Sequence, residues 1–233
     1  MELDFIKEMF DSIAPRYDFL NRLLSLRQDV YWRRTMITAL DLPDNAAVLD
    51  IACGTGDVLI EILNRTGNQQ LVVGADFAPE MLKIANTKLL KGDFSPKTQL
   101  IAGNALYLPF AANTFDAITI AFGIRNIMDR KLALIRFFDC LKPGGKVAVL
   151  ELATPKNKFF LSLYLFYFSR ILPIIGSFFS KHLKAYDYLP ASVINFPPPD
   201  KFSAIMKQAG FGGIKWRRLT MGIATVHIGQ KPY

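Results

Sequence analysis

Short apolar runs rich in β-branched residues alternate with helical patterns through the middle of the chain. These runs predict five strands, at Ala47–Ile51, Leu71–Ala75, Thr98–Ala102, Phe115–Ala121 and Lys146–Leu152. The segments between them predict helices at Asp57–Arg65, Pro79–Leu90 and Asp129–Leu141, the last of them ended by the proline and glycines of Lys142–Gly145. Such alternation is typical of βαβ units, so we expect an α/β fold with a mostly parallel sheet.

The C-terminal part of the chain predicts a different pairing. A helix near Asp200–Ala209 precedes two strands, Ile214–Thr220 and Ile223–Gly229, with only a short turn around Met221–Gly222 between them. Two strands joined by so short a turn run antiparallel, so a C-terminal hairpin is expected to close the sheet. The length of 233 residues predicts a single domain, 1–233.

One apolar stretch, Phe159–Phe179, interrupts the pattern before the last helix. It is long enough to cross a bilayer, which takes roughly 20 residues, but Arg170, Pro173 and Gly176 argue against a clean span. Basic residues flank it, at Lys156, Lys158, Lys181 and Lys184. We expect an apolar helical insertion over 156–196, either touching the membrane interface or forming an ordinary buried cap.

Composition narrows the function classes. A hydrophobic content of 51% excludes a mostly disordered chain, and the net charge of +8 favours an anionic partner, a membrane surface or a nucleic acid, without choosing between them. The chain has only two cysteines and two histidines, without a CxxC pair, so no metal site is expected. The N-terminus carries acidic residues and no uninterrupted apolar segment, which predicts a cytoplasmic protein.

The first predicted strand runs directly into a glycine loop. Gly54, Thr55 and Gly56 follow it and lead into a helix, where the backbone can approach a ligand at the carboxyl end of the strand. Asp76 follows the second strand, where a carboxylate can accept hydrogen bonds from both ribose hydroxyls of an adenosine. Asn104 follows the third strand, where a polar side chain could meet the adenine edge.

Two adenosine-containing ligands are candidates, NAD and S-adenosylmethionine. Position 59 is leucine, so the third small residue of the dinucleotide fingerprint is missing. Asp50 and Asp57 bracket the loop and would repel a pyrophosphate, whereas S-adenosylmethionine carries a sulfonium and an ammonium. The methyl donor is therefore favoured; the alternative is a loop that only makes a tight turn, with Asp57 capping the helix.

Several motifs together resemble one family, the ubiquinone/menaquinone biosynthesis C-methyltransferases, along nearly the whole chain. GTGD and LKPGG are shared by many methyltransferases, whereas AFGIRN and YDYLPASVINFP are far more particular. The matching segments are FDSIA with the following Tyr17, Asp18 and Asn21, then LDIACGTGD, GADFAPEML, LPFAANTFDAITIAFGIRN, LKPGGKVAVLELATP, AYDYLPASVINFP and GIATVHIGQKP. The chain departs from the family at Arg27, where a glycine is usual, and at Phe137–Cys140, which replaces an arginine-containing lead into LKPGG.

The resemblance implies a class I, Rossmann-like methyltransferase fold with a helical lid over 1–40 and the 156–196 insertion as a substrate cap. It implies S-adenosylmethionine contacts at Thr55, Asp76, Asn104, Ala105 and the backbone of Ala121. Its reaction is C-methylation of a reduced, prenylated quinone ring, expected here on demethylmenaquinol, with the benzoquinol of ubiquinone synthesis or a non-catalytic scaffold as alternatives. A homodimer or a quinone-synthesis complex, and transient contact with the inner face of the membrane, are the expected partners.

This chemistry needs a nucleophilic ring carbon, which forms when the adjacent hydroxyl loses its proton. Arg125 is placed to stabilise the resulting oxyanion but is permanently protonated and cannot be the base. Asn126 and Tyr17 could orient a water molecule that takes the ring proton. The alternatives are ordinary polar residues at a strand end and a packed aromatic residue. A nucleic-acid methyltransferase is disfavoured because no Asn-Pro-Pro-aromatic motif follows the fourth strand.

Overall fold

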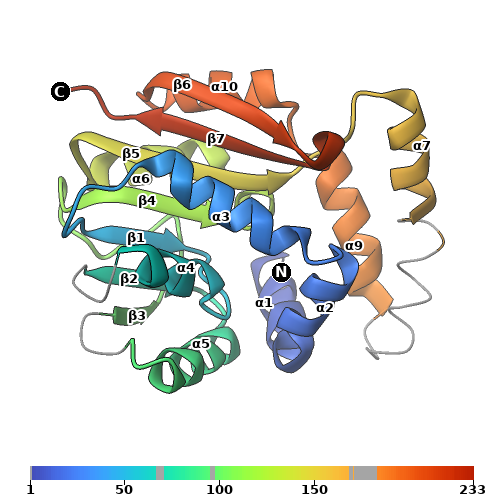
Figure 1. Ribbon diagram of the computed structural model, residues 1–233, viewed down its shortest axis with the longest axis horizontal. Helices are drawn as coiled ribbons and strands as arrows, with labels where there is room; N and C mark the ends of the chain where they lie inside the picture. Colours follow the sequence, from blue (N-terminus) through green and yellow to red (C-terminus); the bar gives the residue numbers. More distant parts are fainter. Residues whose placement is uncertain (1, 67–70, 95–97, 168–169, 171–182) are drawn as a thin grey trace.

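The computed structural model describes residues 2–66, 71–94, 98–167, 170 and 183–233, and a central sheet organises them (Figure 1). Within these residues, seven strands pair in the order β3-β2-β1-β4-β5-β7-β6. Their bounds are β1 Val48–Ile51, β2 Val72–Asp76, β3 Thr98–Ala102, β4 Phe115–Ala121, β5 Leu141–Leu152, β6 Gly212–Leu219 and β7 Ala224–Gln230. Strands β1 to β5 are parallel and β7 is antiparallel to both neighbours, so the predicted parallel sheet with a C-terminal hairpin is confirmed.

Helices cover both faces of this sheet. The α-helices are α1 Glu2–Ile13, α2 Tyr17–Leu24, α3 Gln28–Leu40, α4 Asp57–Thr66, α5 Pro79–Lys91, α6 Arg130–Cys140, α7 Lys158–Phe166, α9 Leu183–Ile194 and α10 Pro199–Gln208. Short 3₁₀ turns lie at η1 Ala14–Arg16, η3 Ile124–Asn126 and η5 Thr220–Gly222. Leu49 packs in the core with α6 and α10, while its neighbour Val48 packs in the core with α3 and α4. Successive strand residues thus serve opposite layers, as expected for a sheet buried on both faces.

The prediction for Lys142–Gly145 is wrong in one respect: this segment ends no helix but belongs to strand β5. Strand β5 begins at Leu141, directly after the helix, and Lys142–Gly145 forms a bulge inside it, since Leu141 pairs with Phe115 and Lys146 pairs with Ala117. Gly144 takes a positive φ of 78°, and its amide donates to the carbonyl of Lys231 at 2.9 Å. Glycine allows this conformation, and the distant C-terminal segment satisfies the backbone that the proline and glycines leave exposed.

The apolar insertion is helical where it is described. Its first part is α7, and α9 follows with Pro190 inside it. Residues 168–169 and 171–182, which include most of the second half of Phe159–Phe179, lie outside the described residues. No helix in the described ranges combines the length and apolar character needed to cross a membrane.

The N-terminal helices lie at the carboxyl ends of the parallel strands (Figure 1), apart from α3, which packs on the sheet itself. The turn between α2 and α3 contains two left-handed residues, Leu26 with φ 50° and Arg27 with φ 62°. A side chain with a Cβ is strained in this region, whereas glycine is not. The glycine usual at position 27 in the resembled family therefore matches the backbone that this chain adopts with arginine.

Replacing Arg27 with glycine should raise the free energy of unfolding by about 0.5 to 1 kcal/mol, because it removes the strain of a Cβ in the left-handed region. Glycine also gives the unfolded chain more conformational freedom, and this effect offsets only part of the gain. Urea unfolding followed by circular dichroism measures the change. Arg27→Ala is the matched control, since alanine removes the exposed side chain but keeps the Cβ. Equal stability of the glycine and alanine variants would contradict the prediction.

Candidate active site

A pocket opens at the carboxyl ends of β1, β2 and β4, under the N-terminal helices. Seven of the residues predicted from the sequence line it: Tyr17, Gly54, Asp76, Asn104, Ala105, Ala121 and Asn126. They come from six different segments of the chain, and the remaining lining is mostly apolar, with Phe10, Phe77 and Phe122 among it. The fold therefore brings these seven predicted residues together in one cavity.

The other four predicted residues lie just behind the lining. Asp50 is buried within β1 and accepts a hydrogen bond from the Thr119 hydroxyl at 2.6 Å. Burial raises the pKa of Asp50 to about 8, so its carboxyl is protonated at neutral pH. Gly56 has a positive φ, and a Cβ there would lie 3.2 Å from the Cβ of Ala85, so this glycine lets α4 and α5 approach. Thr55 and Arg125 face other partners, described below.

Asp76 joins the end of β2 to the glycine loop. One carboxylate oxygen accepts from the Gly54 amide and the other from the Ala78 amide, both at 2.8 Å. Each carboxylate oxygen has a second lone pair, so Asp76 can still accept hydrogen bonds from a ligand in the pocket. Burial raises the pKa of this carboxyl, while the backbone amides work in the opposite direction.

Tyr17 lies against the glycine loop from the other side. A Cβ built on Gly54 would be 4.0 Å from the Tyr17 ring, and the ring of Phe10 packs edge-on to Tyr17 at 6.2 Å between centroids. Burial raises the pKa of Tyr17, so its phenol is protonated at neutral pH and can act as a hydrogen-bond donor.

Arg125 forms a buried ion pair that the sequence did not predict. Its Nη1 donates to Glu151 Oε1 at 2.5 Å and to the Phe122 carbonyl at 2.6 Å. Burial alone would lower the pKa of Arg125, but Glu151 outweighs burial and raises it. The only sequence signal for Glu151 is a charged residue inside the apolar run Val147–Leu152, which ordinary analysis assigns to a strand.

The insertion also reaches the site. The Tyr188 hydroxyl, from α9, donates to the Asn126 side-chain oxygen at 3.1 Å. The segment expected to form the substrate cap thus contacts one of the predicted catalytic residues.

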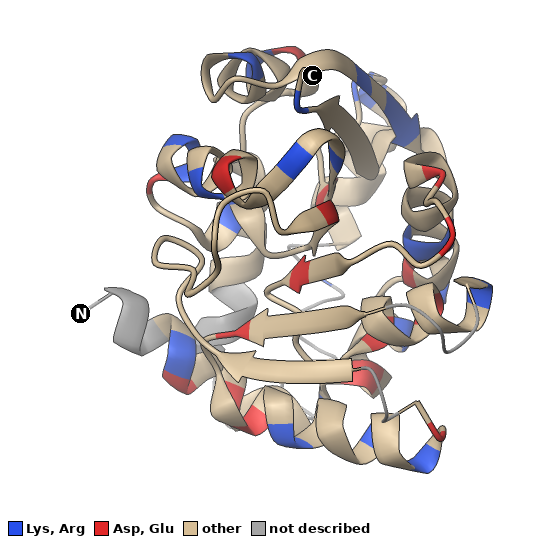
Figure 2. Cartoon of the chain, turned by 90° about the vertical axis from the view of Figure 1, so that its left-hand side faces the viewer, with Lys and Arg blue, Asp and Glu red and all other residues tan. Residues whose placement is uncertain are grey.

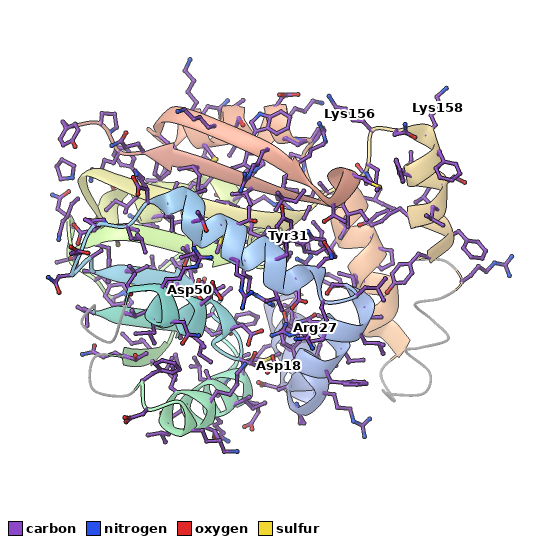
Figure 3. The ribbon with its side chains drawn as sticks, in the orientation of Figure 1. Asp18, Arg27, Tyr31, Asp50, Lys156 and Lys158 are labelled. Carbon is purple, nitrogen blue, oxygen red and sulfur yellow. The ribbon has the colours of Figure 1, made fainter. Side chains whose placement is uncertain are left out.

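A charge cluster connects α2 and α3 to the glycine loop. Thr55 donates its hydroxyl to Asp18 on α2 at 2.5 Å, and Lys88 on α5 donates to Asp18 at 2.8 Å and to Asp57 at 2.5 Å. Asp57 also accepts from Arg22 of α2 at 2.7 Å. The position of Asp18 on α2 and of buried Asp50 in β1 can be followed in Figure 3.

The same cluster continues to α3 through Asp29. This aspartate is buried and accepts from Arg22 and from Arg33, the latter at 2.6 Å. Burial alone would raise the pKa of Asp57, but Arg33 and Lys88 outweigh it and lower the pKa to about 2. These ion pairs fasten the N-terminal helices to the loop that lines the pocket.

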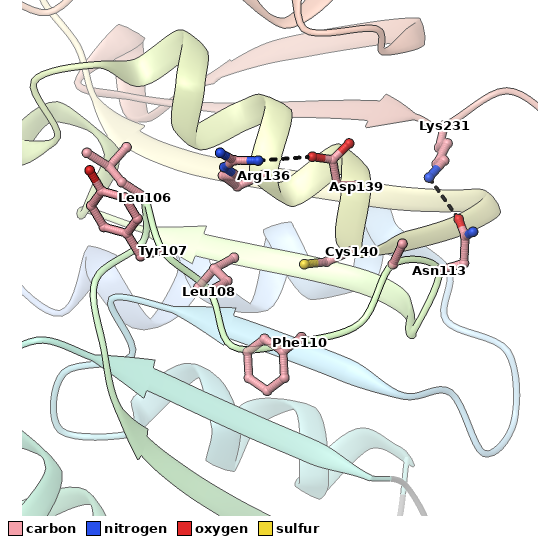
Figure 4. A pocket seen from close by; sticks show the side chains of 10 residues that line it. Leu106, Tyr107, Leu108, Phe110, Asn113, Arg136, Asp139, Cys140 and Lys231 are labelled. Carbon is pink, nitrogen blue, oxygen red and sulfur yellow. Dashed lines mark hydrogen bonds and ion pairs between the residues drawn. The ribbon is translucent and has the colours of Figure 1, made fainter.

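A second hollow, of about 610 Å³, lies between the 106–113 loop and the end of α6 (Figure 4). Lys231 donates there to the Asn113 side chain and to the carbonyls of Phe138 and Leu141, all within 2.9 Å. Because this ammonium group already has three acceptors and none of the predicted site residues lines the hollow, we assign it a structural role.

His227 is likewise structural. It is buried in β7 between the rings of Phe202 and Trp216, and burial lowers its pKa to about 4. Its imidazole is therefore neutral at pH 7, and it is not among the residues that line the pocket.

Solved structures similar to this chain define its class. The [4+2]-cyclase SpnF superposes with a TM-score of 0.74 at 13% identity, covering 97% of this chain and 95% of that one. A SAM-dependent methyltransferase from Aquifex aeolicus superposes with a TM-score of 0.65 at 17% identity, covering 94% and 97%. The chain has the class I, Rossmann-like fold of S-adenosylmethionine-dependent methyltransferases.

The family follows from the sequence comparisons. Residues 2–231 match the model of the ubiE/COQ5 methyltransferase family, and the chain belongs to that family. It is 46% identical to the ubiquinone/menaquinone biosynthesis C-methyltransferase UbiE of Geotalea daltonii, over 97% of this chain and 96% of the relative. It is 44% identical to the demethylmenaquinone methyltransferase of Thermus thermophilus, over 96% of this chain and all (100%) of the relative.

Asp57→Asn should lower the free energy of unfolding at pH 7 by about 2 kcal/mol, because a folded-state pKa below the unfolded value stabilises the folded protein. That contribution is complete above the unfolded pKa of 3.8 and is lost as the pH falls through the folded pKa of about 2. Urea unfolding at a series of pH values should therefore show the two proteins converging in acid. Asp44→Asn, at an exposed position, is the control, and a difference that does not change with pH would refute the assignment.

Proposed function

We propose that this protein transfers a methyl group from S-adenosylmethionine to a ring carbon of a reduced, prenylated quinone, with demethylmenaquinol as its main acceptor. The observation that carries the proposal is the buried Arg125 guanidinium beside the pocket. Its Nε has no hydrogen-bond partner in the described part of the chain, so a donor remains for a ligand. The relatives' names, which include demethylmenaquinone methyltransferase, support the choice of acceptor.

The pocket residues suit the cofactor. When bound, S-adenosylmethionine supplies a methyl group activated by a positively charged sulfur. Asp76 would accept hydrogen bonds from the ribose, and Asn104 with the backbone near Ala105 would meet the adenine. Gly54 and Ala121 line the same cavity without bulky side chains, which leaves room for the methionine part.

The protein's own residues then serve the acceptor. A quinol hydroxyl would pass its proton to water, and Arg125 would stabilise the phenolate while the ring carbon takes the methyl group, with S-adenosylhomocysteine as the leaving group. Asn126 and Tyr17 would hold a water molecule that takes the ring proton, which restores the aromatic ring as a phenolate, and this phenolate takes a proton from water to give the methylated quinol. Holding the ring about 3 to 3.5 Å from the methyl carbon supplies a large part of the rate.

Two alternatives remain part of the test. The benzoquinol intermediate of ubiquinone synthesis has the same phenolate chemistry, and the name of the Geotalea relative includes both pathways. A non-catalytic scaffold would bind the cofactor without needing the donor at Arg125. Basic and acidic residues are interspersed on the face drawn in Figure 2, which gives no support to a nucleic-acid substrate.

The decisive experiment is transfer of labelled methyl to chemically reduced demethylmenaquinol and, in parallel, to the demethylated benzoquinol, with the methylated ring identified by mass spectrometry. Wild-type protein should label the naphthoquinol ring more rapidly. Label in neither ring, with S-adenosylmethionine binding intact by calorimetry, would refute the quinol proposal.

Arg125→Lys should reduce kcat by about 10²- to 10³-fold while leaving cofactor affinity unchanged, because lysine keeps the charge but cannot direct the guanidinium donors. Arg136→Lys, at the second hollow, is the matched control and should transfer normally. Unchanged transfer by Arg125→Lys would remove Arg125 from the mechanism.

We also propose that the acceptor reaches the pocket from a membrane surface. Large apolar side chains are exposed on α2, on the turn that follows it, on α7 and on η5, and Lys156 and Lys158 lie at the start of α7 (Figure 3). These exposed residues are Phe19, Leu23, Leu26, Phe159, Leu163, Leu165, Phe166 and Met221. The Tyr167 hydroxyl donates to the Leu24 carbonyl at 3.0 Å, so the end of α7 lies against α2.

In flotation with vesicles containing anionic lipid, the wild-type protein should rise with the lipid. The double variant Phe159→Ser, Leu163→Ser should bind at least about five-fold more weakly, because each substitution removes an apolar side chain that the membrane could bury. Tyr107→Ser, which removes an exposed ring on another surface, is the control. Wild-type protein that stays in the aqueous fraction with and without anionic lipid would refute membrane delivery.

A further inference from the structure

Glu151 is the only acidic residue in the central part of β5, and its side chain is completely buried. Burying a carboxylate costs several kcal/mol unless it is paired and fully hydrogen-bonded. A strand position facing the core is normally filled by an apolar residue, as at Val147 and Val149 of the same strand. The cost of this carboxylate therefore calls for a function.

Its hydrogen bonds point to that function. Oε2 accepts from the backbone N–H of Arg125 at 3.1 Å, and Oε1 accepts from Arg125 Nη1 at 2.5 Å. Oε1 also accepts from the backbone N–H of Leu152 at 2.8 Å. One side chain thus holds both the backbone and the guanidinium of Arg125.

The Phe122 carbonyl takes a second hydrogen bond from Nη1, and Arg130 Nη2 donates to the Arg125 carbonyl at 2.9 Å. The guanidinium is therefore fixed on the side of Glu151, while Nε keeps no partner in the residues described. The next residue, Asn126, shares the η3 turn and lines the pocket. Because Asn126 follows Arg125 directly in this turn, the hydrogen bond to the Arg125 backbone N–H also fixes the position of Asn126.

We infer that Glu151 is a positioning residue for methyl transfer, which orients Arg125 toward the developing phenolate and sets the η3 turn that carries Asn126. The inference rests on the proposed function. Each hydrogen-bond partner of the Glu151 carboxylate in the described residues is a donor, so the position needs a side chain with acceptors on both oxygens. Glutamine cannot replace it, because either amide orientation sets its NH₂ group against an N–H of Arg125 or Leu152.

Glu151→Gln should lower kcat for the quinol about 10- to 100-fold, while KM for the quinol and calorimetric affinity for S-adenosylmethionine change less than about three-fold. Orientation acts on the transition state, and a misplacement of about 1 Å costs a rate factor of this size. Glu61→Gln, at a carboxylate of α4 that pairs with Arg34 and Arg65 and does not line the pocket, is the matched control and should leave kcat unchanged.

A double-mutant cycle separates positioning from general destabilisation. In an Arg125→Lys background, Glu151→Gln should reduce kcat by a smaller factor than it does in the wild-type background, because the guanidinium that it orients is already absent and only its bond to the backbone N–H of residue 125 remains to be lost. Glu151→Asp, which keeps the charge but is one methylene shorter, provides a second variant if glutamine does not fold, and it should show the same loss of kcat.

Wild-type kcat in either Glu151 variant, or fully multiplicative losses in the cycle, would overturn the inference while the quinol activity of the wild-type protein stands. Absence of transfer by the wild-type protein would instead refute the proposed function. The two failures are therefore distinguishable in one set of assays.

Discussion

Strand β1 pairs in parallel with β2 on one side and with β4 on the other, and the whole site depends on this arrangement. The chain moves outward from β1 through β2 to β3 and then returns to β4. Connections leaving two adjacent strands in opposite directions open a crevice at their carboxyl ends. The glycine loop, Asp76 and the η3 turn all begin at these strand ends, so one pairing constraint brings together residues far apart in the chain.

Buried carboxylates support this crevice in three different ways. Asp50 has no cationic partner at hydrogen-bond distance within the described residues and stays protonated, held by Thr119. Asp57 is surrounded by Arg22, Arg33 and Lys88 and stays ionised. Glu151 is buried and forms an ion pair with Arg125. The environment, rather than the residue type, decides whether each carboxylate fills space, fastens helices or orients a neighbour.

Local pattern is sufficient to predict the parallel strands, because apolar β-branched runs between glycine and proline signals form strands whatever their neighbours. It also predicts Asp76 and the glycine loop, since both adjoin strand ends. It fails at the start of β5, where the chain bulges only because Lys231 supplies backbone partners from the far end of the sequence. It does not decide the role of Asp50, since an aspartate bracketing a loop can face the ligand or the core.

Glu151 and Tyr188 show the same limit within the site. Their partners Arg125 and Asn126 lie 26 and 62 residues away, so only the folded chain reveals that they belong to the site. These side-chain contacts matter because the fold alone does not specify the reaction. A [4+2]-cyclase has the same fold, with a TM-score of 0.74. Chemistry on this scaffold must reside in the few polar side chains aimed at the crevice and in the groups that aim them. A buried arginine whose Nε has no partner in the described residues, held at backbone and side chain by one carboxylate, meets the requirement of a reaction that develops negative charge on an oxygen.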